Sequence, residues 1–236
     1  DLYGEPRFAD VLRAVDAAGI ERLRFATSHP KDLTDEVIGL FATLPSLMPA
    51  LHLPVQSGSN RILSAMNRRY TREHYLGLIE KLRRARPDIA LSTDIIVGFP
   101  GETEENFMDT YRLVEEVGYS QVFTFIYSKR EGTPAAEMDD DTPREVIQER
   151  FDRLVDLVQR KAFEANQAEL GATVPVLVEG TSKRDDSILA GKSPKNQTVH
   201  APVPAGADAA SLVGRIVPVT IEEARTWYLS GTIVHA

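Results

Sequence analysis

The stretch STDIIVGFPGET, residues 92–103, decides the fold of this chain. Its first half is apolar and β-branched and predicts a strand over Ile89–Gly98. Two glycines and a proline then predict a tight turn, and Thr103 with the two glutamates after it predicts a helix start, where negative charge suits the helix dipole. No Gly-Lys-Ser or Gly-Lys-Thr follows, so this turn is not a Walker loop. The stretch therefore predicts one βα unit.

The same pattern repeats on both sides of this stretch. Three more strands are predicted at residues 21–27, 50–55 and 121–127. Helical patterns separate the strands at residues 8–19, 34–43, 59–66, 72–86 and 103–117. This alternation predicts an α/β domain with four parallel strands, too few to close a barrel, and with ligands at the C-terminal ends of the strands.

The rest of the chain predicts a long helix and a second, all-β domain. From Pro143 to about Leu170, apolar residues recur at spacings of three and four, which predicts one amphipathic helix packed on the sheet. Five short strands are then expected, at residues 174–179, 187–191, 198–201, 214–222 and 229–234. Such strands predict a small β-barrel of the oligonucleotide-binding kind. We therefore divide the chain into residues 1–142, a linking helix over 143–169 and a barrel over 170–236.

The composition is that of a folded protein, with 236 residues of which 42% are hydrophobic. Neither a membrane-spanning run nor a signal peptide is visible, so we expect a cytoplasmic protein with no membrane partner. The chain has no cysteine, and its five histidines lack close metal-binding spacing, so no metal site is expected from this chain alone. The net charge of −8 argues mildly against unassisted binding of nucleic acid, but the excess acid lies in residues 1–169.

Polar side chains follow the predicted strand over residues 50–55. Gln56, Ser57 and Ser59 supply amide and hydroxyl groups that could bind a ribose or an amino-acid moiety, although helix capping explains them equally well. Arg68, just beyond a short helix, could clamp a carboxylate in a bidentate pair.

The next two strand ends carry further polar groups. Asp94 lies inside an apolar strand, where a carboxylate is costly to bury unless it is paired, and the alternative to a ligand contact is a structural pair with an arginine. After the turn at Gly98, the helix amides could face a ligand. Tyr127 and Ser128 end the third strand, where an aromatic residue more often packs in the core than stacks on a base.

Five runs are the most specific features in order and spacing: TSHPKD (27–32), LHLPVQSGS (51–59), RRYTRE (68–73), TDIIVGFPGETEENF (93–107) and YSKREGTPAA (127–136). Together they resemble the radical-SAM enzymes, specifically the methylthiotransferases of the MiaB type, from about residue 20 to the end. The resemblance implies the C-terminal part of a partial (βα)6 barrel, of which the four predicted strands would be the last four.

The resemblance also implies S-adenosylmethionine as cofactor. Gln56 and Asp94 would contact its ribose, and Arg68 would bind its carboxylate. Three residues would shape the same pocket: Ser57, Ser59 and Gly98. Two aromatic residues would lie beside the adenine: Phe125 and Tyr127. The broader superfamily has a glutamate where Gly101 stands here, so no role is assigned to Glu102.

Residues 170–236 resemble the TRAM domain, a small β-barrel that binds RNA. The run Thr181–Arg184, then Gly191, Lys192 and Asn196, resembles the run found in the members that modify tRNA. Lysines and arginines at the loop tips of a small barrel can meet phosphates. The expected RNA contacts are Lys183, Arg184, Lys192 and Asn196. Solvated loop charge is the alternative, and the two aspartates that directly follow Arg184 favour it.

The family reaction requires a Cys-x-x-x-Cys-x-x-Cys loop that holds one 4Fe-4S cluster, and an N-terminal domain that holds a second. This chain contains neither, so we expect an N-terminal truncation, with both clusters bound outside this chain and no turnover by it alone. For the intact protein the resemblance implies transfer of a methylthio group to C2 of N6-isopentenyladenosine next to the anticodon of tRNA, through a 5'-deoxyadenosyl radical. The alternatives are methylthiolation of a ribosomal protein and a non-catalytic RNA-binding adaptor.

Overall fold

The structure is a computed structural model that describes residues 7–26, 29–139 and 142–234. The chain divides into two compact units, Asp1–Val158 and Gln159–Ala236. Among the described residues, no helix is long and apolar enough to cross a membrane.

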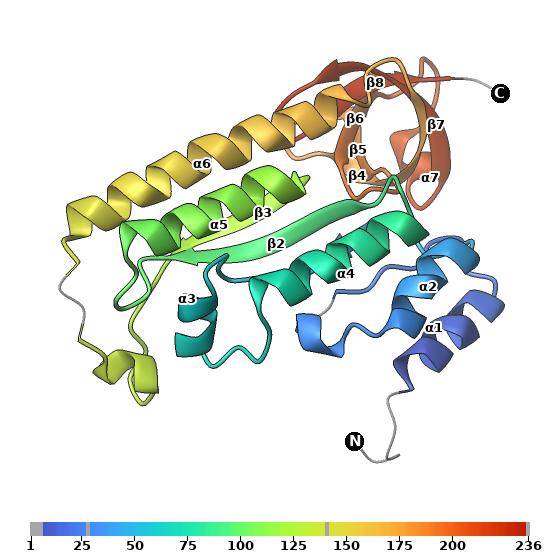
Figure 1. The fold of residues 1–236 in the computed structure, drawn as a ribbon. Helices are drawn as coiled ribbons and strands as arrows, with labels where there is room; N and C mark the ends of the chain where they lie inside the picture. Colours follow the sequence, from blue (N-terminus) through green and yellow to red (C-terminus); the bar gives the residue numbers. More distant parts are fainter. Residues whose placement is uncertain (1–6, 27–28, 140–141, 235–236) are drawn as a thin grey trace. The chain divides into compact units, whose positions relative to one another are not determined.

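The first unit is built on a three-stranded parallel sheet in the order β1-β2-β3 (Figure 1). The strands are β1 (Ala50–His52), β2 (Ala90–Val97) and β3 (Gln121–Ile126). The helices are α1 (Phe8–Ala17), α2 (Asp35–Thr43), α3 (Asn60–Ala65), α4 (Arg72–Ala85) and α5 (Glu104–Val117), with 3-10 turns η1 (Pro30–Asp32) and η2 (Pro134–Glu137). Each predicted helix is confirmed to within three residues at either end.

The predicted strand over residues 21–27 was wrong for the part that the structure describes. Leu23 and Ala26 make only isolated parallel bridges, to Leu47 and His52. Leu23 and Ala26 are three positions apart in the chain, whereas their partners Leu47 and His52 are five positions apart, so the two segments drift out of register and no continuous ladder forms. Thr27 lies outside the described residues. The described sheet therefore has three strands and not four.

Strand β1 ends at His52, three residues before the predicted end. Pro54 has no N–H group and cannot donate to the ladder. The Thr93 hydroxyl fills this gap, because it accepts a hydrogen bond from the Val55 N–H and donates one to the Leu53 carbonyl, both at 2.9 Å. The segment thus stays attached to β2 without being a regular strand.

The two faces of β2 have different surroundings. Leu91, Thr93, Ile95 and Val97 are buried against the helices, and α4 and α5 run along this side of the sheet (Figure 1). The alternate residues, which include Asp94, are only partly buried. The sheet therefore has one face packed on the core and one open face, as the two-residue period of a strand requires.

The predicted long helix is confirmed as α6 (Arg144–Gln167). Its apolar residues Leu154, Leu157 and Val158 belong to the core of the first unit. Pro143 precedes the first helical residue, where its missing N–H costs nothing.

The second unit is a closed barrel with the strand order β4-β5-β6-β8-β7. Its strands are β4 (Thr173–Ser182), β5 (Asp185–Lys192), β6 (Thr198–Pro202), β7 (Ile216–Ala224) and β8 (Leu229–Ile233), with the short helix α7 (Ala209–Leu212). All five predicted strands are confirmed, and pairing between β4 and β7 closes the barrel. Gly231 marks a close crossing, since a Cβ atom there would lie 1.9 Å from the Thr220 carbonyl oxygen.

Candidate functional site

The backbone fixes Gln56 beside β2. Its N–H donates to the Asp94 carbonyl and its own carbonyl accepts from the Ile96 N–H, both at 2.9 Å. Its φ of 69° lies in the left-handed region, which is uncommon for a residue other than glycine and is enriched at functional sites. The Gln56 side-chain amide makes no hydrogen bond within the described residues, so the fold does not use it.

Asp94 lies on the open face of the sheet and is paired there with a histidine. His52 Nε2 is 3.5 Å from Asp94 Oδ2, and His52 Nδ1 is 3.0 Å from Ser92 Oγ. The histidine ring also meets Phe123 edge-on, with the ring centroids 5.8 Å apart. The arginine partner considered for Asp94 is thus replaced by His52. Sequence reasoning missed His52, although it stands in the run LHLPVQSGS and pairs with Ser92 in the β1–β2 ladder.

Arg68 lies three residues after the end of α3. Asn67 takes the left-handed conformation, with φ of 57°, and the Arg68 N–H donates to the Leu63 carbonyl at 2.8 Å, which closes the helix end. Burial, and then the positive charge of Arg68, lower the pKa of His29. The ring of His29 packs edge-on against Tyr70, whose hydroxyl donates to the carbonyl of Val55, three residues after β1, at 2.9 Å. The Arg68 guanidinium therefore lies near the end of β1, and it has no ion pair among the described residues.

The two serines of the strand-end loop bind α5. Ser57 Oγ is 3.2 Å from Thr110 Oγ1, and Ser59 Oγ accepts a hydrogen bond from Asn106 Nδ2 at 3.0 Å. Between them, a Cβ atom on Gly58 would lie 2.5 Å from a backbone oxygen of α5, so only glycine fits. The serines and the glycine hold the loop on the helix. Their direct contact with a ligand stays a prediction.

Gly98 and the turn after β2 are also engaged within the fold. The Gly98 N–H donates to Glu102 Oε2 at 2.9 Å, and a Cβ atom on Gly98 would lie 2.6 Å from Ile147 Cγ2 of α6. Glu102 is 3% exposed, its carbonyl accepts from Arg150 Nη1 at 2.9 Å, and burial raises the pKa of its carboxyl to about 7. The turn therefore carries a structural carboxyl that the sequence did not reveal.

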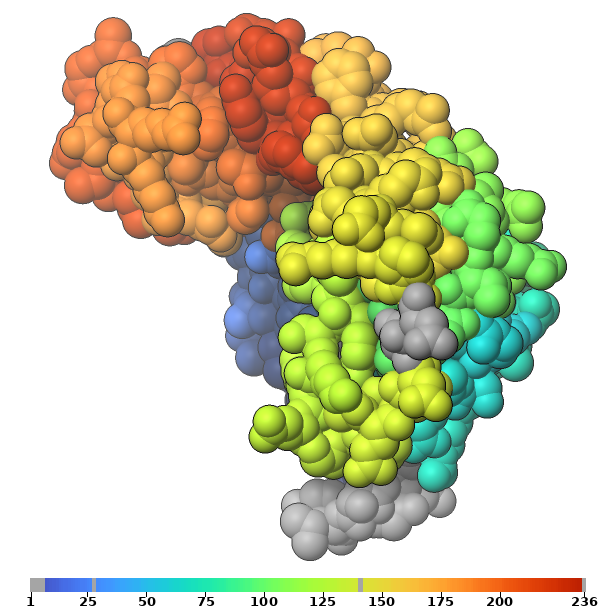
Figure 2. Space-filling model, turned by 90° about the vertical axis from the view of Figure 1, so that its left-hand side faces the viewer, coloured from blue at the N-terminus to red at the C-terminus, as the bar shows by residue number. Residues whose placement is uncertain are grey.

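Two aromatic residues lie at the C-terminal end of β3, one with an exposed ring and one with a buried hydroxyl. Phe125 is 51% exposed and pairs in register with Ile96, on the open face. The Tyr127 ring packs against Phe99 at 5.1 Å, and the Tyr127 hydroxyl is buried without a hydrogen-bond partner among the described residues. Residues 127–139, in yellow-green, then run over the surface of the first unit (Figure 2). An unsatisfied buried hydroxyl costs about 1–3 kcal/mol, which a ligand group would relieve.

Five groups near the strand ends have the chemistry to contact S-adenosylmethionine, and one of them, Asp94, is already paired with His52. They comprise an amide and a carboxylate for ribose hydroxyls, a guanidinium for a carboxylate, and a hydroxyl beside an exposed ring for a base: Gln56, Asp94, Arg68, Tyr127 and Phe125. An iron–sulfur cluster does not fit, because the chain has no cysteine. No group of three or more His, Cys, Asp or Glu side chains in the described part of the chain could hold a metal ion.

Two of the predicted RNA contacts lie at the tip of the β4–β5 hairpin. Lys183 and Arg184 are exposed and have no ion pair within the described residues. Asp185 instead accepts hydrogen bonds from the hydroxyl and the N–H of Ser187, at 2.6 and 2.9 Å, and Asp186 accepts one from a threonine hydroxyl at 3.2 Å. The neighbouring carboxylates thus do not hold the two cations.

The other two predicted contacts lie at the opposite end of β5. Lys192 Nζ donates to Thr198 Oγ1 at 2.9 Å, and Asn196 occupies a left-handed position, with φ of 67°, in the β5–β6 turn. Because a strand rises about 3.3 Å per residue, Arg184 and Lys192 are roughly 26 Å apart along the strand. The structure therefore does not bring the four residues together.

The comparisons with known proteins agree with this architecture. Residues 1–114 match the family described as the Radical SAM superfamily, and residues 167–234 match the TRAM domain. A solved structure titled "Coproporphyrinogen III oxidase (HemN) from Escherichia coli is a Radical SAM enzyme" superposes with a TM-score of 0.52 at 14% identity, and covers 80% of this chain and 50% of that one. That likeness shows the fold alone.

Curated relatives match nearly the whole chain. It is 50% identical over 235 residues to the tRNA-2-methylthio-N(6)-dimethylallyladenosine synthase of Acetivibrio thermocellus, a match that covers 99% of this chain and 48% of the relative. The protein of the same name from Carboxydothermus hydrogenoformans is 48% identical, with 99% and 52% covered. The chain spans about half the length of the curated relatives it matches. The chain is therefore similar to the Radical SAM superfamily over residues 1–114, to the TRAM domain over residues 167–234, and to about half of each of these synthases.

Proposed function

We propose that the protein is a tRNA methylthiotransferase that adds a methylthio group to C2 of N6-isopentenyladenosine next to the anticodon. In this proposal the chain supplies part of the S-adenosylmethionine pocket and the RNA-binding barrel. One observation carries the cofactor part. In the strand-end loop the two serines are bound to α5, whereas the amide of Gln56, fixed beside Asp94, is left unused.

Each available group has a role set by its chemistry. The Asp94 carboxylate accepts hydrogen bonds from ribose hydroxyls, with the Gln56 amide beside it, and the Arg68 guanidinium binds the carboxylate of the amino-acid moiety. Phe125 flanks the adenine, and the buried Tyr127 hydroxyl gains a partner. When bound, S-adenosylmethionine supplies radical chemistry.

His52 is a positioning residue in this proposal. Its Nδ1 meets Ser92 Oγ at 3.0 Å, and its Nε2 lies 3.5 Å from Asp94 Oδ2. Held from both sides, the imidazole keeps the Asp94 carboxylate turned toward the open face of the sheet, where a ribose would lie.

We assign the anticodon stem-loop of tRNA as the partner of the barrel. The exposed cations Lys183 and Arg184 are free to meet phosphates, and the names of the relatives support tRNA as the substrate. From this proposed tRNA substrate we infer a cytoplasmic location.

The cofactor role is tested by binding of S-adenosylhomocysteine, measured by equilibrium dialysis on the protein expressed from its whole reading frame. This ligand keeps the ribose, the adenine and the carboxylate. Asp94→Asn and Arg68→Ala should each weaken its affinity about 10- to 100-fold, because each removes a charge-assisted contact. Asp88→Asn, an exposed carboxylate paired with Arg86 at 2.9 Å, is the matched control and should leave the affinity unchanged. Unchanged affinity in Asp94→Asn would sink the assignment of the pocket.

The acceptor is tested with isopentenylated tRNA and a ribosomal protein offered to the same protein. We expect the mass increase of a methylthio group on the tRNA alone. Transfer to the ribosomal protein would favour the alternative, a methylthiotransferase that acts on a ribosomal protein. Retained RNA binding without transfer to either acceptor would favour an RNA-binding adaptor.

A further inference from the structure

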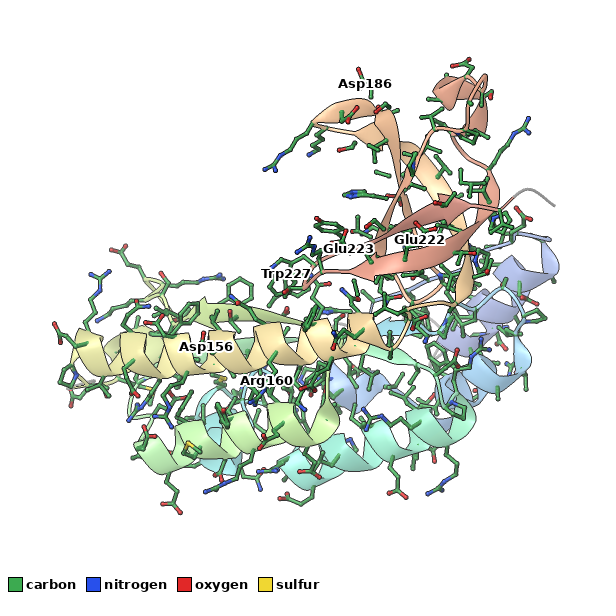
Figure 3. All side chains as sticks on the ribbon, turned by 90° about the horizontal axis from the view of Figure 1, so that it is seen from above. Asp156, Arg160, Asp186, Glu222, Glu223 and Trp227 are labelled. Carbon is green, nitrogen blue, oxygen red and sulfur yellow. The ribbon has the colours of Figure 1, made fainter. Side chains whose placement is uncertain are left out.

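Two aromatic rings meet on the outside of the barrel, and an exposed tryptophan is the neighbour of one of them in the chain. Trp227 is 53% exposed and Tyr228 is 36% exposed, and both belong to the loop between β7 and β8. Figure 3 labels Trp227. The ring of His200, on β6, lies 5.0 Å from the ring of Tyr228 at an interplanar angle of 36°. We call His200, Trp227 and Tyr228 the aromatic face.

The strand alternation turns His200 outward. Val199 and Ala201, on either side of it, are 1% and 4% exposed and face the barrel core. The cross-strand neighbours of His200 are Ala190 on β5 and Ser230 on β8, both small, so no bulky side chain covers the imidazole from the adjacent strands. Burial lowers the pKa of His200, so the ring is neutral near pH 7 and presents a flat, uncharged surface.

The charges around the aromatic face are nearly balanced. Glu223 is held by Arg225 Nη2 at 2.5 Å and by Ser230 Oγ at 3.2 Å. Lys192 lies on the same outer face, because it pairs with Thr198, two residues before His200 and about 7 Å along the strand. Such a surface is poor at collecting phosphates by charge alone.

Exposed aromatic rings beside one cation suit a base and its phosphate. Stacking on an aromatic ring tolerates any base, because every base has a π face, and it needs no excess positive charge. A double helix keeps its bases stacked on one another, whereas unpaired bases are available. We propose that the aromatic face stacks the unpaired bases of single-stranded RNA, with Lys192 beside it for a phosphate. This inference rests on the proposed RNA role of the barrel and assigns its base-contacting surface.

The test uses the only tryptophan of the chain as its reporter. A ten-nucleotide oligoadenylate is titrated into the 236-residue chain, and Trp227 emission is recorded together with the anisotropy of the same oligonucleotide carrying a dye. We expect tryptophan quenching to follow the binding curve, and a duplex of equal length to give no quenching. Trp227→Ala should weaken binding about 5- to 100-fold, and Trp227→Phe should restore most of the affinity.

Val213→Ala is the matched control, because Val213 is 48% exposed on the same unit but is not part of the aromatic face. It should bind oligoadenylate as the parent chain does. Saturable binding without quenching, unchanged in Trp227→Ala, would overturn the stacking role and leave the proposed RNA function standing. Absence of binding by either signal would overturn both.

Discussion

The two units differ in how completely the polar side chains at their strand ends are paired. In the first unit, the Gln56 amide and the buried Tyr127 hydroxyl have no hydrogen-bond partner among the described residues, although both lie at strand ends. In the second unit, buried polar side chains satisfy one another. Unused polar groups beside an open sheet face indicate a site completed by a ligand, whereas a closed barrel with its polar groups paired must act through its outer surface.

The polar network of the second unit illustrates this closure. Asn166 donates to the carbonyls of the β7–β8 loop, to Arg225 at 2.7 Å, and accepts from Gln197 Nε2 at 3.1 Å. Gln197 in turn accepts from Ser193 Oγ at 2.9 Å. These bonds join the end of α6 to two loops of the barrel.

The largest effect is expected where the barrel closes. Gly231→Ala places a Cβ atom 1.9 Å from the Thr220 carbonyl oxygen, a clash with backbone that cannot be relieved by a side-chain rotation. We expect it to destabilise the second unit by more than about 4 kcal/mol. Denaturation followed by Trp227 fluorescence reports this unit, and circular dichroism at 222 nm reports mainly the helices of the first.

Gly180→Ala is the control for this substitution, because a Cβ atom there would have nothing within 4 Å. It should leave the fluorescence transition within about 1 kcal/mol of the parent. If Gly231→Ala shifted the helical signal as much as the fluorescence, the two units would unfold together and the contrast between them would not hold.

A smaller effect is expected from the buried carboxyl of the first unit. Glu102 is 3% exposed, and burial raises its pKa from 4.5 in the unfolded chain to about 7. Between these values the folded state keeps a proton that the unfolded state releases, so the stability it gives is complete below about pH 4.5 and is lost as the pH rises through 7. The total loss is about 3 kcal/mol at one pKa unit per 1.36 kcal/mol.

Glu102→Gln isolates this contribution from all other titrations. A glutamine can still accept the Gly98 N–H bond that Glu102 Oε2 makes at 2.9 Å, but it cannot ionise. In urea denaturation followed at 222 nm, the free energy of unfolding of the variant should increase relative to that of the parent as the pH rises from 5 to 8. A stability difference that stayed constant with pH would mean that Arg150 keeps the carboxylate ionised throughout.

The local features of both units could be predicted from the sequence. Helix starts such as Thr103, which accepts from the Asn106 N–H, follow from capping chemistry over a few residues. The five barrel strands follow from alternation and from turns rich in glycine and proline. The position of Gln56 just after a strand, and of Asp94 within the next one, follows as well from the alternation of strands and helices.

The features that were missed depend on distant parts of the chain. Whether residues 21–26 form a strand is decided by register against residues 47–52, and Pro49 lies inside that second segment. The pairing of His52 with Asp94 joins residues on neighbouring strands, which no local pattern reveals. The distance between Arg184 and Lys192 depends on where β5 begins and ends. The sequence alone does not show that one strand separates these two predicted RNA contacts.

The smallest effect is expected on RNA affinity, from removing single cations at the two ends of β5. Lys183→Ala and Lys192→Ala each remove one cation, from opposite ends of β5, and a ten-nucleotide RNA that contacts the aromatic face reaches Lys192 before the hairpin tip. On the short RNA, we expect Lys192→Ala to lower the slope of log affinity against log salt by about 1, and Lys183→Ala to change this slope less. On an intact anticodon stem-loop, we expect both variants to change the slope by a similar amount. Anisotropy titrations from 50 to 300 mM KCl measure both slopes. Equal slopes for the two variants on the short RNA would show that the ends of β5 act as one phosphate-binding surface.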